Sequence, residues 1–365
     1  MGKRILDLFR RDVVLTASLV LAALSCLVTP PGPDYLAYID YNTLIILLCL
    51  MLIVEGLRQK NVLQFVAEWV LRRVRTVKGL IYTLVFLCFF SSMLVTNDVA
   101  LITFVPFALV ILRMADMRER LCYTVTLMTM AANLGSMLTP IGNPQNLYLF
   151  TLSGLSLPGF LGLTGPYTAL AALLLALAVF FGYRQSWLHM EVGASQPLDR
   201  RAVGFYGALF LLCILTVSGL LPHVALLAVV CAALLWRDRG LFGRVDYSLI
   251  LTFVFFFVFV GNMKGIPGLE EWLGGMLVGH ERPAGVLVSQ IISNVPAAML
   301  LSSYSQSIPE LIVGTNLGGL GTLIASMASL ISYKQVAGQY PSLRKRYLIL
   351  FTLLNLGFLV LLYWI

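Results

Sequence analysis

Long apolar runs of about 20 residues follow one another along the chain, with short polar connections between them. Residues 13–28 and 168–181 are two such runs, and neither shows the alternation of polar and apolar positions that a transmembrane β-strand requires. An α-helix needs about 20 mainly apolar residues to cross the hydrocarbon core of a membrane. The pattern therefore predicts an all-α polytopic membrane protein.

The runs predict about nine full spans, two of them interrupted by Gly, Pro and amide residues. Two further apolar units carry a polar break in the middle, which divides each unit into two arms. We expect the full spans at residues 13–29, 41–57, 121–150 (interrupted), 165–183, 203–221, 223–236, 245–262, 308–333 (interrupted) and 347–365, and the divided units at residues 79–112 and 284–305.

The composition excludes an ordinary soluble protein. Of the 365 residues, 59% are hydrophobic and 12% are charged, and the mean hydropathy is +0.90. A soluble protein typically carries about 25% charged residues. The spans leave no stretch long enough for a sizeable soluble domain.

The basic residues predict the orientation in the membrane. The net charge is +8, and if the N-terminus is cytoplasmic, all Lys and Arg residues except Lys264 and Arg282 fall in cytoplasmic connections. This distribution follows the positive-inside rule. It predicts a multi-pass protein of the plasma membrane (the inner membrane of a bacterium) in contact with the lipid bilayer. No nucleic-acid partner is needed to explain the basic charge.

The two halves of the chain resemble each other. The first half starts outside the cell and the second starts inside, so similar segments would lie in opposite orientations, as in the inverted-topology repeats of alternating-access carriers. Each half also contains an amphipathic stretch, at residues 61–76 and 267–279. Three pairs of segments align: residues 133–143 (NLGSMLTPIGN) with 316–326 (NLGGLGTLIAS), residues 92–98 (SMLVTND) with 289–295 (SQIISNV), and Asp40-Tyr41 with Asp246-Tyr247.

This repeat divides the chain into four predicted parts. Residues 1–40 form a first helix and an outer loop, and residues 41–183 form repeat 1 with its scaffold span, interface helix, hairpin, broken helix and closing span. Residues 184–244 form a cytoplasmic linker and two linking spans. Residues 245–365 form repeat 2, inverted.

The four polar interruptions are the expected functional site. Backbone groups left unpaired in the hydrocarbon core need partners from the protein or from a water-filled cavity. Helix N-termini there favour anions, and freed carbonyls beside Ser, Thr and Asn oxygens suit a small hard cation. The interruptions lie at residues 96–98 and 139–146 in the first half, and at residues 293–296 and 314–322 in the second.

The divided unit 284–305 predicts a re-entrant hairpin. Its arms have about ten residues each and, at 1.5 Å per residue, reach about half of a 30 Å core. The arms of unit 79–112 are longer, so two full spans remain an alternative for that unit. Symmetry between the halves favours a second re-entrant hairpin.

Asp98 is the one acidic residue in the middle of an apolar unit. A carboxylate inside a membrane is costly, and it is usually paired or functional. We expect Asp98 to serve in proton coupling or cation binding. The alternative is that Asp98 caps the second arm of its hairpin, because aspartate is a good N-cap residue.

At these residues the chain resembles the ion transporter superfamily of arsenite permeases, bacterial sodium/proton antiporters, citrate permeases and divalent-anion/sodium symporters. It is most similar to the short bacterial permeases described as anion transporters. The resemblance covers residues 40–365 and is most specific at Thr139-Pro-Ile-Gly-Asn-Pro-Gln-Asn146 and at the Asn-bearing tips. It implies a homodimer of scaffold and transport domains with an elevator-like movement.

The breaks and the resemblance together predict the site residues. A coupling ion, H⁺ or Na⁺, is expected at Ser92, Thr96, Asn97, Asp98, Gly142, Ser289, Ser293, Asn294 and Gly319. A small anion is expected at Thr96, Asn97, Asp98, Asn143, Pro144, Gln145, Asn146, Ser293, Asn294, Val295 and Thr322.

The tips depart from one branch of this superfamily. Dicarboxylate symporters carry Ser-Asn-Thr at both tips, whereas this chain has Thr96-Asn97-Asp98 and Ser293-Asn294-Val295. Two hydroxyls that would face a carboxylate are missing, and an ionised Asp98 would repel a dianion. The Asn-Asp pair is more similar to the arsenite-permease and antiporter branch, which favours proton-linked movement of a small anion or a neutral oxyacid.

The sequence accordingly predicts an ion-coupled secondary active transporter of a small anion, such as the carboxylate citrate or the oxyanion arsenite. A sodium/proton antiporter that uses Asp98 and carries no anion is the alternative. An intramembrane enzyme is disfavoured because the sequence has no intramembrane His–Ser pairing, HExxH zinc motif or cofactor fingerprint. A passive channel is disfavoured because a site built twice suits alternating access.

Overall fold

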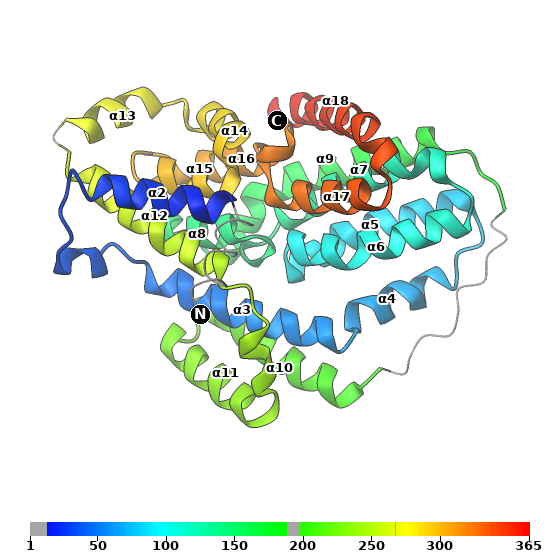
Figure 1. Ribbon diagram of the computed structural model, residues 1–365, viewed down its shortest axis with the longest axis horizontal. Helices are drawn as coiled ribbons and strands as arrows, with labels where there is room; N and C mark the ends of the chain where they lie inside the picture. The colour runs from blue at the N-terminus through cyan, green and yellow to red at the C-terminus, as the bar shows by residue number, and fades with distance from the viewer. Residues whose placement is uncertain (1–12, 188–197, 267) are drawn as a thin grey trace.

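The computed structural model describes residues 13–187, 198–266 and 268–365 (Figure 1). Over these ranges the chain forms helices and contains no β-strand, apart from one isolated bridge between Thr76 and Trp187. The predicted all-α fold is therefore confirmed. Residues 1–12 of the predicted first part, residues 188–197 of the predicted linker, and residue 267 of the second amphipathic stretch lie outside the described residues.

The α-helices follow the predicted runs closely. They are α2 (Val13–Ser25), α3 (Tyr41–Gln59), α4 (Val62–Leu71), α5 (Val77–Val95), α6 (Asn97–Met114), α7 (Leu121–Ser136), α8 (Pro144–Ser153), α9 (Leu157–Gly182), α10 (Arg200–Val217), α11 (His223–Arg237), α12 (Ser248–Lys264), α13 (Leu269–Leu277), α14 (Glu281–Ile292), α15 (Asn294–Ser302), α16 (Ile308–Leu317), α17 (Met327–Gln339) and α18 (Arg344–Tyr363).

Six helices of the described part are long and apolar enough to cross a membrane, namely α3, α5, α6, α9, α10 and α18, and the number is seven if the bent pair α12–α13 counts as one span. Each of the expected spans coincides with a helix or a broken pair of helices. Three of those helices are short, since α2, α11 and α12 have 13, 15 and 17 residues. Helix length therefore supports a polytopic membrane protein but yields fewer crossings than predicted.

The scaffold spans α3 and α12 follow the aligned residues Asp40 and Asp246, and Asp40 is the N-cap of α3 whereas Asp246 precedes the N-cap of α12, Tyr247. Asp40 Oδ1 accepts a hydrogen bond from the Thr43 N–H (3.2 Å), and Asp246 Oδ1 accepts one from the Ser248 N–H (3.0 Å). Aspartate favours such positions because its carboxylate satisfies an N–H group that the first helical turn leaves unpaired. An aspartate therefore accepts a hydrogen bond from the first turn of the scaffold span in each half.

The divided units form the helix pairs α5–α6 and α14–α15. Their tip residues have almost the same backbone conformation, with φ 73° and ψ 151° at Thr96 and φ 75° and ψ 155° at Ser293. Positive φ is rare outside glycine. Because the two residues also align in sequence, the shared conformation indicates a structural repeat. The hairpins differ in length, since the arms have 19 and 18 residues in the first and 12 and 9 in the second.

The spans α7–α8 and α16–α17 are interrupted at equivalent residues. A short 3-10 turn occupies each interruption, η3 (Pro140–Gly142) in the first half and η5 (Leu323–Ala325) in the second. In the first half, Pro144 removes a backbone donor at the start of α8. In the second, Gly321 adopts φ +106°, which a residue with a Cβ rarely adopts. Different residues therefore produce the same break.

The amphipathic stretches form α4 and α13, each joined to its scaffold span by a residue in the left-handed conformation. These residues are Asn61 (φ 53°) before α4 and Gly268 (φ 77°) before α13. Asparagine and glycine tolerate this region better than other residues. Each scaffold span therefore ends in a sharp turn that redirects the chain.

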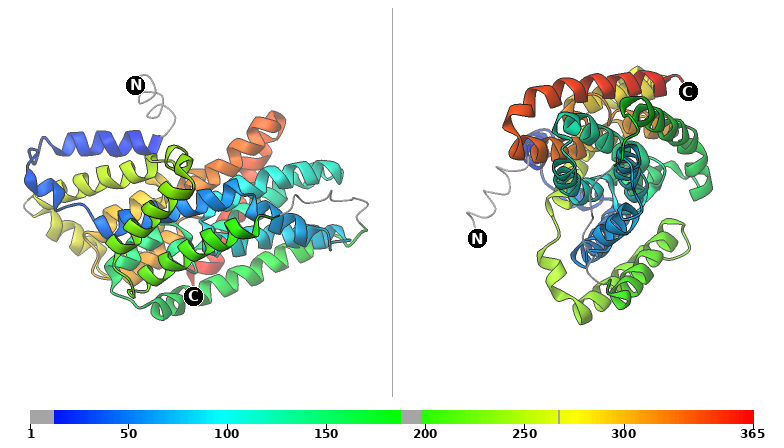
Figure 2. Two further views of the ribbon diagram at one scale, coloured as in Figure 1. Left: turned by 90° about the horizontal axis from the view of Figure 1, so that it is seen from below. Right: turned by 90° about the vertical axis from the view of Figure 1, so that its right-hand side faces the viewer.

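The helices pack around two clusters of buried apolar side chains. One cluster joins α5, α6, α7, α9, α17 and α18, and the other joins α3, α8, α10, α11, α12 and α15. Helices α5, α6, α7 and α17 lie towards one end of the molecule and α2 and α12 towards the other (Figure 1). Helices α10 and α11 lie on the flank opposite α18 (Figure 2). We refer to the end where α3, α6 and α17 finish as the basic end, because the helix ends and connections that follow α3, α4, α6, α9, α11 and α17 carry all the described Lys and Arg residues except Lys264, Arg282 and Lys334, which lies inside α17.

Candidate functional site

The first hairpin tip is linked through Asn133 to the broken span of the second half. Asn97, the first residue of α6, donates through Nδ2 to Asn133 Oδ1 at 3.1 Å. Asn133 lies on α7, and its own Nδ2 donates to the carbonyl of Gly319 (3.4 Å) and to Ser329 Oγ (3.3 Å). Ser326 Oγ donates back to Asn133 Oδ1 at 3.1 Å. Asn133 therefore joins the first tip to the second break.

The second tip reaches the same place. A Cβ placed on Gly319 would lie 3.1 Å from Asn294 Nδ2, so Asn294 packs directly against this glycine. Ser293 Oγ donates to Asn294 Oδ1 at 3.4 Å. A continuous path thus runs from Asn97 through Asn133 and Gly319 to Asn294. The structure brings together the two asparagines that the sequence places at opposite tips.

Each break is also held to its own hairpin by a threonine. Thr139 Oγ1 donates to the Met93 carbonyl at 2.5 Å, and the aligned Thr322 Oγ1 donates to the Gln290 carbonyl at 3.3 Å. Met93 and Gln290 occupy aligned positions one turn before the tips. Gln290 adds bonds from its Nε2 to the carbonyls of Gly318 and Leu320, both at 2.9 Å.

The amides of the first break contact the second half of the chain. Asn316 Nδ2 donates to Asn146 Oδ1 at 2.6 Å, and Asn143 Nδ2 lies 3.4 Å from Asn316 Oδ1. Gln145 Nε2 donates to the Thr315 carbonyl at 3.2 Å. Asn146 and Gln145 are completely buried. These amides brace the two breaks against each other.

Asn143 and Asn146 also satisfy the broken backbone of their own span. Asn143 Oδ1 accepts from the Asn146 N–H at 2.9 Å and so caps α8. Asn146 Nδ2 lies 3.3 Å from each of the carbonyls of Ser136, Met137 and Thr139. Those carbonyls lose their helical partners where α7 ends. The amides therefore supply the partners that a break inside a membrane requires.

Two serines of the predicted cation site lie at close helix contacts. Ser92 Oγ donates to the Phe89 carbonyl (2.9 Å) and Ser289 Oγ to the Gly285 carbonyl (2.6 Å), and both serines are completely buried. A Cβ on Gly135 would lie 2.7 Å from Ser92 Oγ, and a Cβ on Gly318 would lie 2.6 Å from Ser289 Oγ. Glycine therefore lets each broken span approach its hairpin in the same way.

Three more of the predicted residues, Gly142, Pro144 and Val295, bring no polar side chain to a ligand. Gly142 packs against the Ser136 carbonyl, and Pro144 is the first residue of α8. Val295, which aligns with Asp98, is buried and places no polar group at the second tip. The two tips are therefore alike in backbone but differ in charge.

Asp98 lies in the first turn of α6 and is half-buried. Its backbone N–H donates to Asn97 Oδ1 at 2.9 Å. The Asp98 carboxylate has no hydrogen bond or ion pair with any residue in the described part of the chain. The N-cap of α6 is Thr96, so the alternative role of Asp98 as a cap does not match the structure. The carboxylate is therefore available to a proton or a cation.

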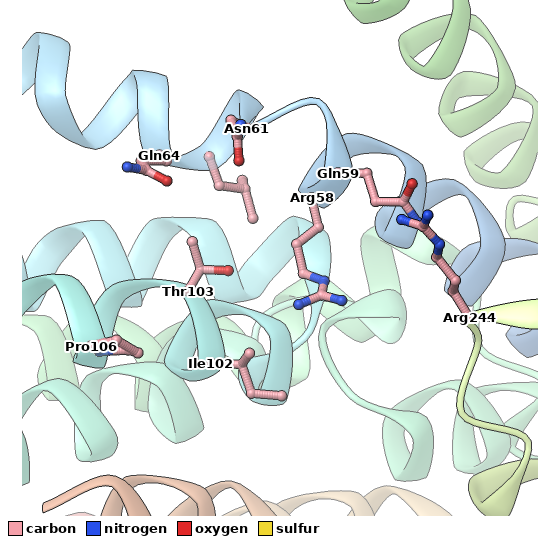
Figure 3. A pocket seen from close by; sticks show the side chains of 9 residues that line it. Arg58, Gln59, Asn61, Gln64, Ile102, Thr103, Pro106 and Arg244 are labelled. Carbon is pink, nitrogen blue, oxygen red and sulfur yellow. The ribbon is translucent and has the colours of Figure 1, made fainter. Parts of the chain in front are cut away.

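A cavity of about 460 Å³ opens at the basic end, between the α3–α4 turn and α6 (Figure 3). Ile102, one turn beyond Asp98, is the lining residue closest to the first tip. The complete lining is Arg58, Gln59, Asn61, Leu63, Gln64, Ile102, Thr103, Pro106 and Arg244.

A second cavity of about 580 Å³ occupies the equivalent place at the opposite end, between the α12–α13 turn and the end of α15. Its residues on the hairpin side begin at Ser303, which aligns with Pro106. The basic-end cavity thus extends about four residues, or roughly 6 Å of helix, closer to its tip. The complete lining is Lys264, Ile266, Gly268, Glu270, Glu271, Gly274, Gly275, Ser303, Tyr304, Ser305 and Gln306.

Some residues of this region were absent from the predicted site. Asn133 and Asn316 head the two aligned segments, and that shared position was the signal that could have identified them. Gln290, Ser326 and Ser329 could not be found in the same way, because their aligned partners are different residue types.

The chain matches known transporters over most of its length. A family model described as Citrate transporter matches residues 4–331. The chain is 33% identical over 301 residues to an uncharacterized transporter of Methanocaldococcus jannaschii, covering 81% of each chain. It is 31% identical to the inner membrane protein YbiR of Escherichia coli, covering 82% of this chain and 80% of that protein. The putative transporter arsB of Dictyostelium discoideum is 27% identical over 33% of this chain and 21% of its own.

These matches confirm the resemblance that the tips and breaks indicate. The matched region, residues 4–331, contains both hairpins and both interruptions. The chain belongs to the Citrate transporter family, within the ion transporter superfamily, and is a polytopic membrane transporter.

Proposed function

We propose that the chain is an ion-coupled secondary active transporter of a small anion, either an organic carboxylate such as citrate or an inorganic oxyanion such as arsenite. The observation that carries this proposal is the convergence of two inverted half-sites, joined through Asn97, Asn133, Gly319 and Asn294. Amide donors and two helix N-termini, those of α6 and α15, meet at this point. Such groups favour an anion.

The test is flux in proteoliposomes of the purified chain. Labelled citrate and labelled arsenite are supplied in turn, with and without gradients of Na⁺ and of pH. We expect one of the two anions to accumulate only when a gradient is present. Sodium-dependent proton movement with no added anion would instead establish the second candidate, a sodium/proton antiporter. The observation in favour of this second candidate is the unpaired Asp98 carboxylate, which is available to a proton or to Na⁺.

The two cavities support an alternating-access mechanism of the elevator type. They lie at equivalent places in the inverted halves, and the one at the basic end extends closer to its tip. We propose that the basic end is cytoplasmic, that the N-terminus lies on that side of the plasma membrane, and that the described conformation opens inward. In the second conformation, the cavity at the opposite end would extend closer to its tip than the basic-end cavity does, which is an exchange of roles between the two cavities. By analogy with the superfamily, the protein would act as a homodimer.

The exchange of roles makes a specific prediction about contacts. In the described conformation Thr151 of α8 meets the start of α3, because Thr151 Oγ1 lies 3.0 Å from Thr43 Oγ1 and 3.4 Å from Asp40 Oδ2. The residues aligned with Thr151 and Asp40 are Lys334 and Asp246. We therefore expect Lys334 to approach Asp246 in the other conformation.

Paired cysteine variants measure this approach in the full-length chain. Oxidation should form a disulfide in D40C/T151C and also in D246C/K334C, and each disulfide should stop transport until it is reduced. As a control, D246C with a cysteine at Gly338, one turn further along α17, should cross-link less. Failure of D246C/K334C to cross-link in an active transporter would contradict the exchange.

Replacing Asp98 with asparagine tests the coupling role. Asparagine resembles the protonated carboxyl, so Asp98→Asn should transport at a rate that no longer changes with pH, whereas the wild-type rate should change. The measurement is the initial rate of flux in proteoliposomes at a series of pH values. Asp116→Asn, at an exposed carboxylate beyond the end of α6, should keep the wild-type profile. A wild-type profile in Asp98→Asn would reject the role.

A further inference from the structure

The cavity at the basic end carries positive charge that the proposed transport site does not use. Arg58 extends from the end of α3 towards the face of α6 that carries Ile102 (Figure 3). Arg244, in the connection before α12, lines the same cavity. The other polar side chains of the lining are neutral, and none of the lining residues is acidic.

The two arginines differ in their pairing. Arg58 is held by Glu55, with Nε and Nη2 donating to the two carboxylate oxygens at 2.7 and 2.8 Å. The Arg244 guanidinium forms no hydrogen bond or ion pair within the part of the chain that the structure describes, and the Glu55 carboxylate attracts it without direct contact. Its nearest acidic neighbour in sequence, Asp246, accepts a hydrogen bond from the Ser248 N–H at the start of α12. A guanidinium presents five N–H donors in a planar array that matches carboxylate and phosphate oxygens.

The cavity at the opposite end has the reverse charge. Lys264 aligns with Arg58, but Glu270 and Glu271 stand where the basic-end cavity has Leu63 and Gln64. That cavity has no second basic residue in its lining. The shape of the cavity is thus repeated in the two halves, but its charge is not.

We propose that the basic-end cavity is an anion-binding vestibule, in which Arg244, assisted by Arg58, binds a carboxylate or another oxyanion outside the tip site. Ile102 is five residues from Asn97, so the vestibule lies about 7.5 Å along α6 from the first tip. The place of the vestibule on a transport path rests on the proposed function, whereas its ability to bind an anion does not. The oxyanion is either a free solute or the phosphate of an anionic lipid headgroup.

A cysteine placed in the cavity reports its charge. In Thr103→Cys, a negatively charged methanethiosulfonate should react faster than a positively charged one, after each rate is normalised to that of a free thiol. A unit charge about 7 Å away in water predicts a preference of roughly five- to tenfold. Arg244→Gln should remove most of this preference. Ser303→Cys, in the opposite cavity, should show the reverse preference.

The matched control is Arg239→Gln. Arg239 lies in the same connection as Arg244, but its Nε donates to the Leu235 carbonyl and it does not line the cavity. This variant should keep the full preference of Thr103→Cys for the negative reagent. Equal rates with the two reagents, or a preference that survives Arg244→Gln, would overturn the proposal.

The occupant is identified by protection against an uncharged methanethiosulfonate. In phosphatidylcholine vesicles, millimolar citrate or inorganic phosphate should slow modification of Thr103→Cys, and Arg244→Gln should abolish this protection. Protection in phosphatidylglycerol vesicles without added anion would assign the vestibule to a lipid headgroup. Absence of protection by all three probes would overturn the proposal. A chain that shows protection but no flux of any anion would keep the vestibule and reject the proposed transport function.

Discussion

Replacing Asn97 or Asn294 with alanine is expected to reduce transport by at least about a hundredfold, while the protein still folds and inserts into the membrane. Each asparagine is the first residue of the second arm of a hairpin, where the chain turns beside the break of the second half. Loss of one amide removes the polar group through which that tip meets a solute. Because both tips contribute to one site, each variant alone should be inactive.

The effect on stability should be small by comparison. Alanine at position 97 removes the hydrogen bond to Asn133 and the one that Asn97 Oδ1 accepts from the Asp98 N–H, but Ser326 Oγ still donates to Asn133 Oδ1. Each hydrogen bond of this kind contributes about 1 kcal/mol to the free energy of unfolding. The loss of transport should therefore far exceed any loss of folded protein.

The comparison requires flux and thermal unfolding of the same preparations. Asn355→Ala is the matched control, because Asn355 is a buried amide of α18 that donates to the Phe351 carbonyl, away from the tips. This control should lose a similar amount of stability and retain transport. Normal flux in both Asn97→Ala and Asn294→Ala would reject the proposed site.

The local features of the fold followed from the sequence because they depend on neighbouring residues. Pro144 and the glycines of residues 318–321 break helices wherever they stand in a span, so the predicted interruptions, residues 139–146 and 314–322, overlap the observed ones, residues 137–143 and 318–326. The aligned Thr96 and Ser293 marked the two tips, and the structure gives them the same backbone conformation. The alignment of the two halves of the chain therefore predicted the positions of the tips and of the interruptions.

The contacts between the halves could not be predicted, because they depend on how distant segments pack. No local pattern shows that Asn133 would accept from both Asn97 and Ser326, or that Asn316 would bond to Asn146. The same holds for the charge of the two cavities, which arises where a turn, a hairpin arm and a connection meet. Symmetry did not decide between a re-entrant hairpin and two full spans for residues 79–112, because α5 and α6 are each long enough to cross a membrane whereas α14 and α15 have only 12 and 9 residues.

The second large effect expected is a loss of stability and of transport in Gly135→Ala. An alanine Cβ at this position would lie 2.1 Å from the Phe89 carbonyl oxygen and 2.7 Å from Ser92 Oγ. The first of these atoms belongs to the backbone of α5, so relief requires α5 and α7 to move apart. Overpacking of a tight interior typically costs about 1–3 kcal/mol, and sometimes more. Separation of these helices would also displace Asn97 from Asn133.

The matched control for Gly135→Ala is Gly162→Ala in α9, where a Cβ meets no atom within 4 Å. Alanine is favoured over glycine inside a helix by about 1 kcal/mol, so this variant should be as stable as the wild type or more stable. Thermal unfolding in detergent and the yield of folded membrane protein measure both effects. We expect the unfolding midpoint of Gly135→Ala to fall by several degrees and its transport to be lost. A wild-type midpoint would mean that α5 and α7 do not pack as closely as the structure shows.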